Sequence, residues 1–109
     1  MAGEYDIHID AGATLRHLIT WRAGCNLVDL TNATARMQVG HVGGVPVVEL
    51  ADDDGLTLGD GGTIEIVITA EQTSLLTDGM VYELEVDLGG AVHRLLRGRI
   101  VVTPEYFGG

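Results

Sequence analysis

The chain has 109 residues, of which 46% are hydrophobic, and its formal net charge at pH 7 is −10. This size and hydrophobic content predict one packed domain and argue against a disordered chain. The six basic residues are all arginines, so the acidic surface excludes nucleic-acid binding through a basic patch, and the lack of lysine excludes phosphate-loop and Schiff-base chemistry.

Two further exclusions come from the apolar segments and the cysteine count. No apolar run approaches the ~20 residues that a membrane helix needs, and the first ten residues lack the basic start and apolar stretch of a signal peptide. We therefore expect a protein made in a cytoplasm, with no membrane partner. Cys25 is the single cysteine; it has no internal disulfide partner and is predicted to be a small turn residue.

Alternating apolar and polar residues predict short strands in the first half of the chain. The expected strands are residues 5–9, 14–22, 34–39 and 45–50. In the first of these, Tyr5, Ile7 and Ile9 share one face, and in the second Trp21 is expected to anchor the core. Pro46 indicates that the fourth strand lies at a sheet edge or that the residue begins the strand.

The middle of the chain combines turns, strands and one short helix. Residues 51–55 and 59–62 are predicted turns on either side of a short strand at residues 56–58. Residues 63–68 predict a strand whose isoleucines point inward. Thr69 and Gln72 then fit a capping box, which predicts a single helical turn over residues 70–76.

The last part of the chain predicts a long hairpin, with strands at residues 80–88 and 92–102. A two-residue Gly89-Gly90 loop pairs Asp87 with Val92 and Glu85 with Arg94. Continuing this register sets charged residues opposite apolar ones. A bulge near Leu95, or a three-residue loop with the same effect, corrects the mismatch. The resulting partners are Leu84 with Leu96, Glu83 with Arg97, and Tyr82 with Gly98.

Seven or eight short strands with turns every ~8–12 residues predict an all-β fold. We expect an immunoglobulin-like antiparallel β-sandwich with one short helical turn near residues 70–76. Residues 1–105 form the single domain, and residues 106–109 form a tail that extends as an arm.

No group of residues in the sequence predicts catalysis, a cofactor or a metal. The run Asp52 to Asp54 before Gly55 lacks the spacing of a calcium loop and is interpreted as a solvated turn. The four histidines show no ligand spacing. Ser74, the only serine, lies in the predicted helical turn and outside any nucleophile motif. Glu83 and Glu85 are interpreted as partners of the arginines across the hairpin.

Three segments in fixed order carry a resemblance: DLTNATARMQV, then VVELADDDGLTL, then GTIEIVITAEQTSLLTDGMVYELEVDLGGAVHRLLRGRIVVTPE. Together they resemble a family of small structural proteins of tailed bacteriophages and prophages. They are similar also to the N-terminal domain of the siphophage baseplate upper protein. The resemblance spans roughly residues 15–105 and includes Tyr82-x-Leu84 and Leu95-Leu96-x-Gly98 after the capped turn at Thr69. It brings no catalytic residue with it.

The resemblance implies a non-enzymatic virion protein, assembled in the cytoplasm of a bacterial host. Its partners are then other virion proteins, with many copies in a symmetric assembly. Two placements stay open: a tail or baseplate adaptor, and a capsid decoration or cement protein. A carbohydrate-binding module is a further alternative, because sandwiches often bind sugars through exposed aromatic side chains. An enzyme is the least favoured class.

The candidate interface residues lie at strand edges, at chain ends or in the arginine cluster of the last strand. They are Tyr5, Pro46, Arg97, Arg99, Tyr106 and Phe107.

Overall fold

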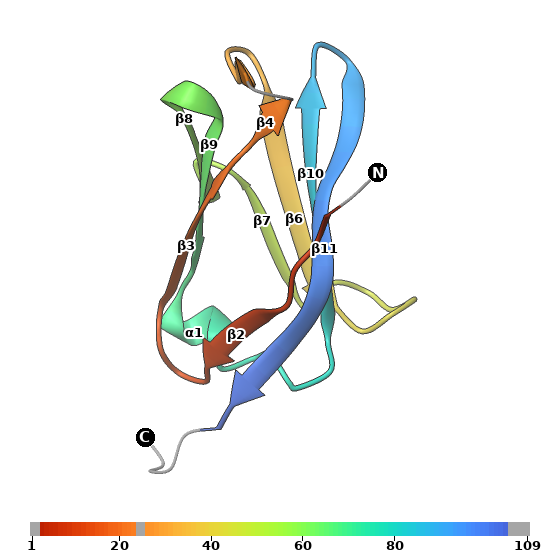
Figure 1. Ribbon diagram of the computed structural model, residues 1–109. Coiled ribbons are helices and arrows are strands. Elements are labelled where there is room, and N and C mark those ends of the chain that lie inside the picture. Colours follow the sequence, from red (N-terminus) through yellow and green to blue (C-terminus); the bar gives the residue numbers. More distant parts are fainter. Residues whose placement is uncertain (1–2, 24–25, 105–109) are drawn as a thin grey trace.

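The computed structural model describes residues 3–23 and 26–104, which form strands with two short helical elements (Figure 1). The strands are β1 (Gly3–Glu4), β2 (Ile7–Asp10), β3 (Leu15–Thr20), β4 (Arg22–Ala23), β5 (Asn26–Leu27), β6 (Thr34–Gly40), β7 (Val48–Asp52), β8 (Gly55–Gly59), β9 (Thr63–Ile68), β10 (Val81–Leu88) and β11 (Ala91–Thr103). The helical elements are the 3-10 turn η1 (Asp60–Gly62) and the helix α1 (Ala70–Thr73). The predicted all-β fold is confirmed; α1 is the predicted helical turn, and η1 is an additional one. Cys25 lies outside the described residues.

The main sheet runs in the order β1-β11-β10-β6-β7-β8-β9-β3, with β2 also paired to β11. Strands β4 and β5 form a separate small hairpin. Figure 1 shows β3, β8 and β9 on one side and β6, β10 and β11 on the other, so the sheet folds over its own core. This confirms the sandwich-like fold. The sheet is mixed, because β1 and β2 run parallel to β11 and β7 runs parallel to β8.

The two ends of the sheet approach each other without a hydrogen-bonded ladder between them. The ring of Tyr5, between β1 and β2, stacks on His17 of β3 with 5.2 Å between ring centroids. Trp21, just after β3, meets His93 of β11 edge to face at 5.4 Å. Trp21 is therefore half-buried at the margin of the core, where the sequence predicted a central anchor.

Inward-facing side chains of both halves fill the core. As predicted, Ile64, Ile66 and Ile68 of β9 are fully buried. They share the core with side chains from β6, β7, β8, β10 and β11. These are Met37, Val39, Leu50, Leu56, Leu84, Val86 and Ile100. Burying each such aliphatic side chain contributes about 1.5–3 kcal/mol, so this inner layer supplies most of the favourable free energy of folding.

The hairpin of β10 and β11 has the predicted register. Asp87 pairs with Val92 and Glu85 with Arg94, and the register then shifts so that Leu84 pairs with Leu96. Gly89 and Gly90 have φ values of 62° and 89°, which is the left-handed backbone that a two-residue hairpin loop requires. The bulge near Leu95 is therefore confirmed.

The short helix begins with the predicted capping box. The Thr69 hydroxyl accepts a hydrogen bond from the Gln72 amide at 3.2 Å, and the Gln72 side chain accepts one from the Thr69 amide at 3.0 Å. The helix ends at Thr73, three residues before the predicted end. Thr73 is buried, and its hydroxyl donates to the Ala13 carbonyl at 2.9 Å. Beyond it, Leu76 bonds back only three residues, as in a 3-10 turn.

The predicted strand over residues 5–9 is wrong at its first two residues, because β2 begins at Ile7. Ile7 and Ile9 face the core, but Tyr5 lies between β1 and β2 and is 46% exposed. The chain crosses over Gly98 at this point. The Tyr5 amide donates to the Arg97 carbonyl at 3.0 Å, and the Tyr5 carbonyl accepts a hydrogen bond from the Tyr82 hydroxyl.

The predicted strand over residues 45–50 begins three residues late, at Val48. Pro46 therefore lies in the loop before β7, and β7 itself is an interior strand between β6 and β8. The Val47 amide donates to the Val39 carbonyl at 2.7 Å, which closes the loop next to β6. Proline has no amide hydrogen to add to a ladder, so the loop accommodates it without loss of a sheet hydrogen bond.

Candidate functional site

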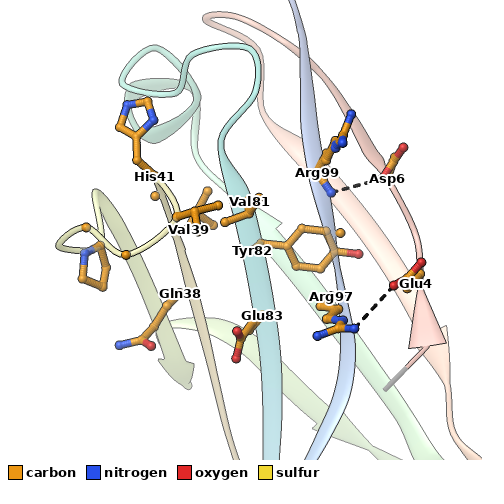
Figure 2. Close-up of a pocket in the computed structure, with 16 residues that line it drawn as sticks. Glu4, Asp6, Gln38, Val39, His41, Val81, Tyr82, Glu83, Arg97 and Arg99 are labelled. Carbon is orange, nitrogen blue, oxygen red and sulfur yellow. Dashed lines mark hydrogen bonds and ion pairs between the residues drawn. The ribbon is translucent and has the colours of Figure 1, made fainter. Parts of the chain in front are cut away.

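An open groove on the outside of the molecule has a volume of about 530 Å³. Four segments border it: the N-terminal segment, the loop of residues 41–47 between β6 and β7, the start of β10, and the middle of β11. Figure 2 shows His41 and Val39 on one side of the groove, and Arg97, Arg99, Glu4 and Asp6 on the other. Because β6, β10 and β11 are adjacent in the sheet, residues distant in sequence meet here.

The loop of residues 41–47 is held in place by its own backbone. The Gly44 amide donates to the His41 carbonyl at 2.9 Å. A Cβ atom at Gly40 would lie 3.1 Å from the Val45 carbonyl oxygen, which shows how closely the two ends of the loop pack. Despite this order, Val42 and Val45 are 82% and 85% exposed. Exposed apolar side chains close together on one loop are a candidate docking surface.

Charges of both signs line the opposite side of the groove. Arg97 forms an ion pair with Glu4 at 3.5 Å. Its cross-strand neighbour Glu83 instead contacts Arg94 at 3.2 Å. The predicted pairing of Glu83 with Arg97 therefore holds for the strand register and not for the ion pair. These partners are exposed, so each pair contributes less than ~1 kcal/mol.

Arg99 places a positively charged side chain in the groove. Its backbone amide donates to the Asp6 carboxylate at 3.1 Å, while its guanidinium has no ion-pair partner among residues 3–23 and 26–104. An arginine that is fixed by its backbone and free at its tip is available to hydrogen-bond a carboxylate or a carbonyl of a partner protein.

Tyr82 lies at the back of the groove and fixes the N-terminal segment to it. Only 1% of Tyr82 is exposed, and its hydroxyl donates to the Tyr5 carbonyl. Burial raises the pKa of the Tyr82 phenol well above its ordinary value of 10.0, and the nearby Tyr5 and Asp6 add to the shift. The phenol therefore stays protonated as a donor at every physiological pH.

The raised pKa of Tyr82 predicts a loss of stability in alkali. The unfolded chain releases this proton near pH 10, whereas the folded chain retains it. The contribution of the Tyr82 phenol to the free energy of unfolding is therefore complete below about pH 10. Above that pH it falls by up to about 1.4 kcal/mol per pH unit. We expect Tyr82→Phe to remove this dependence, as measured by urea unfolding between pH 8 and pH 11. An equal alkaline slope in the variant would contradict the assignment.

Three of the six predicted interface residues meet at the groove. Pro46, Arg97 and Arg99 line it, and Tyr5 adjoins it through the hydrogen bond from Tyr82. Tyr106 and Phe107 lie outside the described residues. The strands predicted at residues 34–39 and 45–50 left residues 40–44 as a connection between them, so the exposed valines were missed. The signal was present in the run Val42-Gly43-Gly44-Val45, where apolar residues flank two glycines.

The other residues that the sequence offered as candidate sites have structural roles. Asp53 has a φ of 61° and Gly55 one of 95°, so the chain turns tightly here as predicted. The turn is shorter than predicted, because Asp52 ends β7 and Gly55 begins β8. A small depression beside it is lined by Asp53, Asp54 and Gln72 among others. The Ser74 hydroxyl donates to the Glu71 carbonyl at 2.6 Å. Within the described part of the chain, no group of three or more metal-ligating side chains comes together.

No helix among the described residues is long and apolar enough to cross a membrane. In comparisons with known proteins, the chain matches no protein-family model and has no significant match to a curated protein sequence. The groove and the resemblance of the sequence segments are therefore the observations that bear on function.

Proposed function

We propose that this chain is a non-enzymatic structural protein of a tailed-bacteriophage virion, which docks onto a larger assembly as a tail or baseplate adaptor. The resemblance of roughly residues 15–105 supports the class of particle. The docking role is supported mainly by the loop of residues 41–47. Its side chains Val42 and Val45 are exposed to solvent beside a groove of mixed charge.

The groove suits a protein partner better than a small substrate. It is open, and its charged side chains are mostly exposed and balanced by neighbours of opposite sign. Exposed apolar side chains on one side of the groove and charged side chains on the other give the mixed composition that is common in protein–protein interfaces. The guanidinium of Arg99, which forms no ion pair with any described residue, adds a directional contact to the apolar contact of the loop.

One loop and one groove make a small interface, and a small interface alone binds weakly. Many copies on a symmetric assembly overcome this limit, since each attached copy raises the effective concentration of the next contact. A virion provides such repetition, which is consistent with a short chain that presents one main docking surface.

Immunogold labelling of intact virions with an antibody against this chain tests the proposal. Under negative-stain microscopy we expect gold at one end of the tail. Pre-incubating the antibody with purified protein is the control, and it should abolish the label. Gold spread over the head would replace the adaptor role with capsid decoration or cement.

An absence of label from every particle would contradict the virion proposal itself. The carbohydrate-binding alternative then has its own measurement in the fluorescence of Trp21, which is half-buried beside His93. A sugar-dependent shift of that emission would favour it, whereas we expect no shift.

A further inference from the structure

Strand β3 ends the main sheet, and its outer backbone edge is not closed by a hydrogen-bonded ladder, although its inward-facing His17 stacks on the Tyr5 ring at the other end of the sheet. It pairs with β9 from Leu15 opposite Ile68 to Thr20 opposite Thr63. Among the described residues, no backbone hydrogen bond joins residues 15–20 to any element other than β9. In an antiparallel pair, alternate residues direct their amide and carbonyl groups away from the partner. Half of the residues of β3 therefore present unpaired backbone groups along this edge.

This edge lacks the features by which monomeric proteins usually block strand addition. Its register is continuous, without a bulge, and its sequence LRHLIT holds no proline. The only formal charge at neutral pH is Arg16, which pairs with Glu65 of its own sheet at 3.6 Å. Leu18, at the centre of the outward-facing side, is 62% exposed. An open, apolar edge of this kind favours pairing with another strand.

The opposite end of the sheet is protected. There, β1 and β2 are short and interrupted by the crossover at Tyr5. Their exposed side chains include Glu4, Asp6 and Asp10, so two copies meeting at this edge repel each other. In a chain with a net charge of −10, β3 is the edge that carries no carboxylate.

We propose that β3 pairs with β3 of a second copy of this chain, antiparallel and about a two-fold axis at Leu18. This register is self-complementary. Leu18 meets Leu18 of the second copy on the outer face, and Arg16 lies opposite Thr20. On the inner face, His17 lies opposite Ile19, and no like charges face each other. The sheet then continues from one copy into the next, whatever particle the protein belongs to.

Sedimentation equilibrium of the purified full chain tests this pairing. The interface is small, so we expect a dimer with a dissociation constant on the order of 10 µM. Leu18→Lys sets two ammonium groups opposite each other and is expected to raise that constant at least about tenfold. The matched control is Leu75→Lys, which adds the same charge at another exposed leucine, outside β3, and leaves dimerisation unchanged.

Three outcomes would overturn the proposal: a monomer at every concentration up to about 1 mM, equal weakening by both lysine variants, or open-ended oligomers that join β3 to the β1–β2 edge.

Hydrogen exchange of the unaltered protein gives a second test that does not depend on a variant. Amides within residues 15–20 should exchange more slowly as concentration rises, and no change across the dimerisation range would contradict the pairing. Thermal unfolding of the Leu18→Lys chain verifies that it is folded.

Discussion

Replacing Gly98 by alanine is expected to destabilise the protein by about 3 kcal/mol or more and to release the N-terminal strands from β11. A Cβ atom on Gly98 would lie 2.1 Å from the Tyr5 carbonyl oxygen and 2.7 Å from its carbon. Both contacts are to backbone, so no side-chain rotation relieves them. The Tyr82 ring lies 3.2 Å away on another side, which closes the remaining space.

Urea unfolding measures the loss, and hydrogen exchange of Ile7 and Ile9 shows whether β2 detaches. Gly44→Ala is the matched control, because its added Cβ meets no atom closer than 3.4 Å and its stability is expected to change by less than about 0.5 kcal/mol. A Gly98→Ala protein as stable as the Gly44→Ala protein would show that the N-terminal crossover contributes little to the fold.

Elements with local signals were predictable from the sequence. The Gly-Gly loop required left-handed backbone at both positions, and the alternating charges of β10 and β11 admitted one register on each side of the bulge. The capping box at Thr69 determined the start of α1 in the same way. In each case a few neighbouring residues contained the whole constraint.

Features that depend on distant contacts were not predictable. Tyr5 fits the alternation of a strand, but its backbone forms hydrogen bonds with Arg97 and Tyr82, which lie more than seventy positions away in the chain. Val47 likewise belongs to an apolar run, but β7 begins only at Val48, after a loop that the Val47–Val39 hydrogen bond closes. The groove was missed for the same reason, since it exists only where β6, β10 and β11 lie side by side.

The docking loop and the β3 edge are separate surfaces with separate tasks. The loop follows β6 in the middle of the sheet, and β3 lies at the sheet's end. If copies pair through β3, each dimer presents two docking loops. A divalent unit binds a repetitive assembly more tightly than a single copy does, because its second contact forms at a high effective concentration.

The double substitution Val42→Ser, Val45→Ser is expected to abolish most docking while leaving the fold intact. Both side chains are directed into solvent, so their replacement changes the free energy of unfolding by less than about 0.5 kcal/mol. A docking surface, in contrast, concentrates its binding energy in a few apolar contacts, and losing two of them lowers affinity by about tenfold or more.

Particles assembled without the native chain and then mixed with purified variant provide the measurement, with bound protein quantified by immunoblot. Leu75→Ser is the control, because Leu75 is also apolar and 54% exposed but lies outside the loop. We expect the Leu75 variant to bind like the native chain and the double variant to remain in solution. If the double variant binds particles at the native level, the loop is not the docking surface, and the exposed apolar residues of the remaining surface become the next candidates.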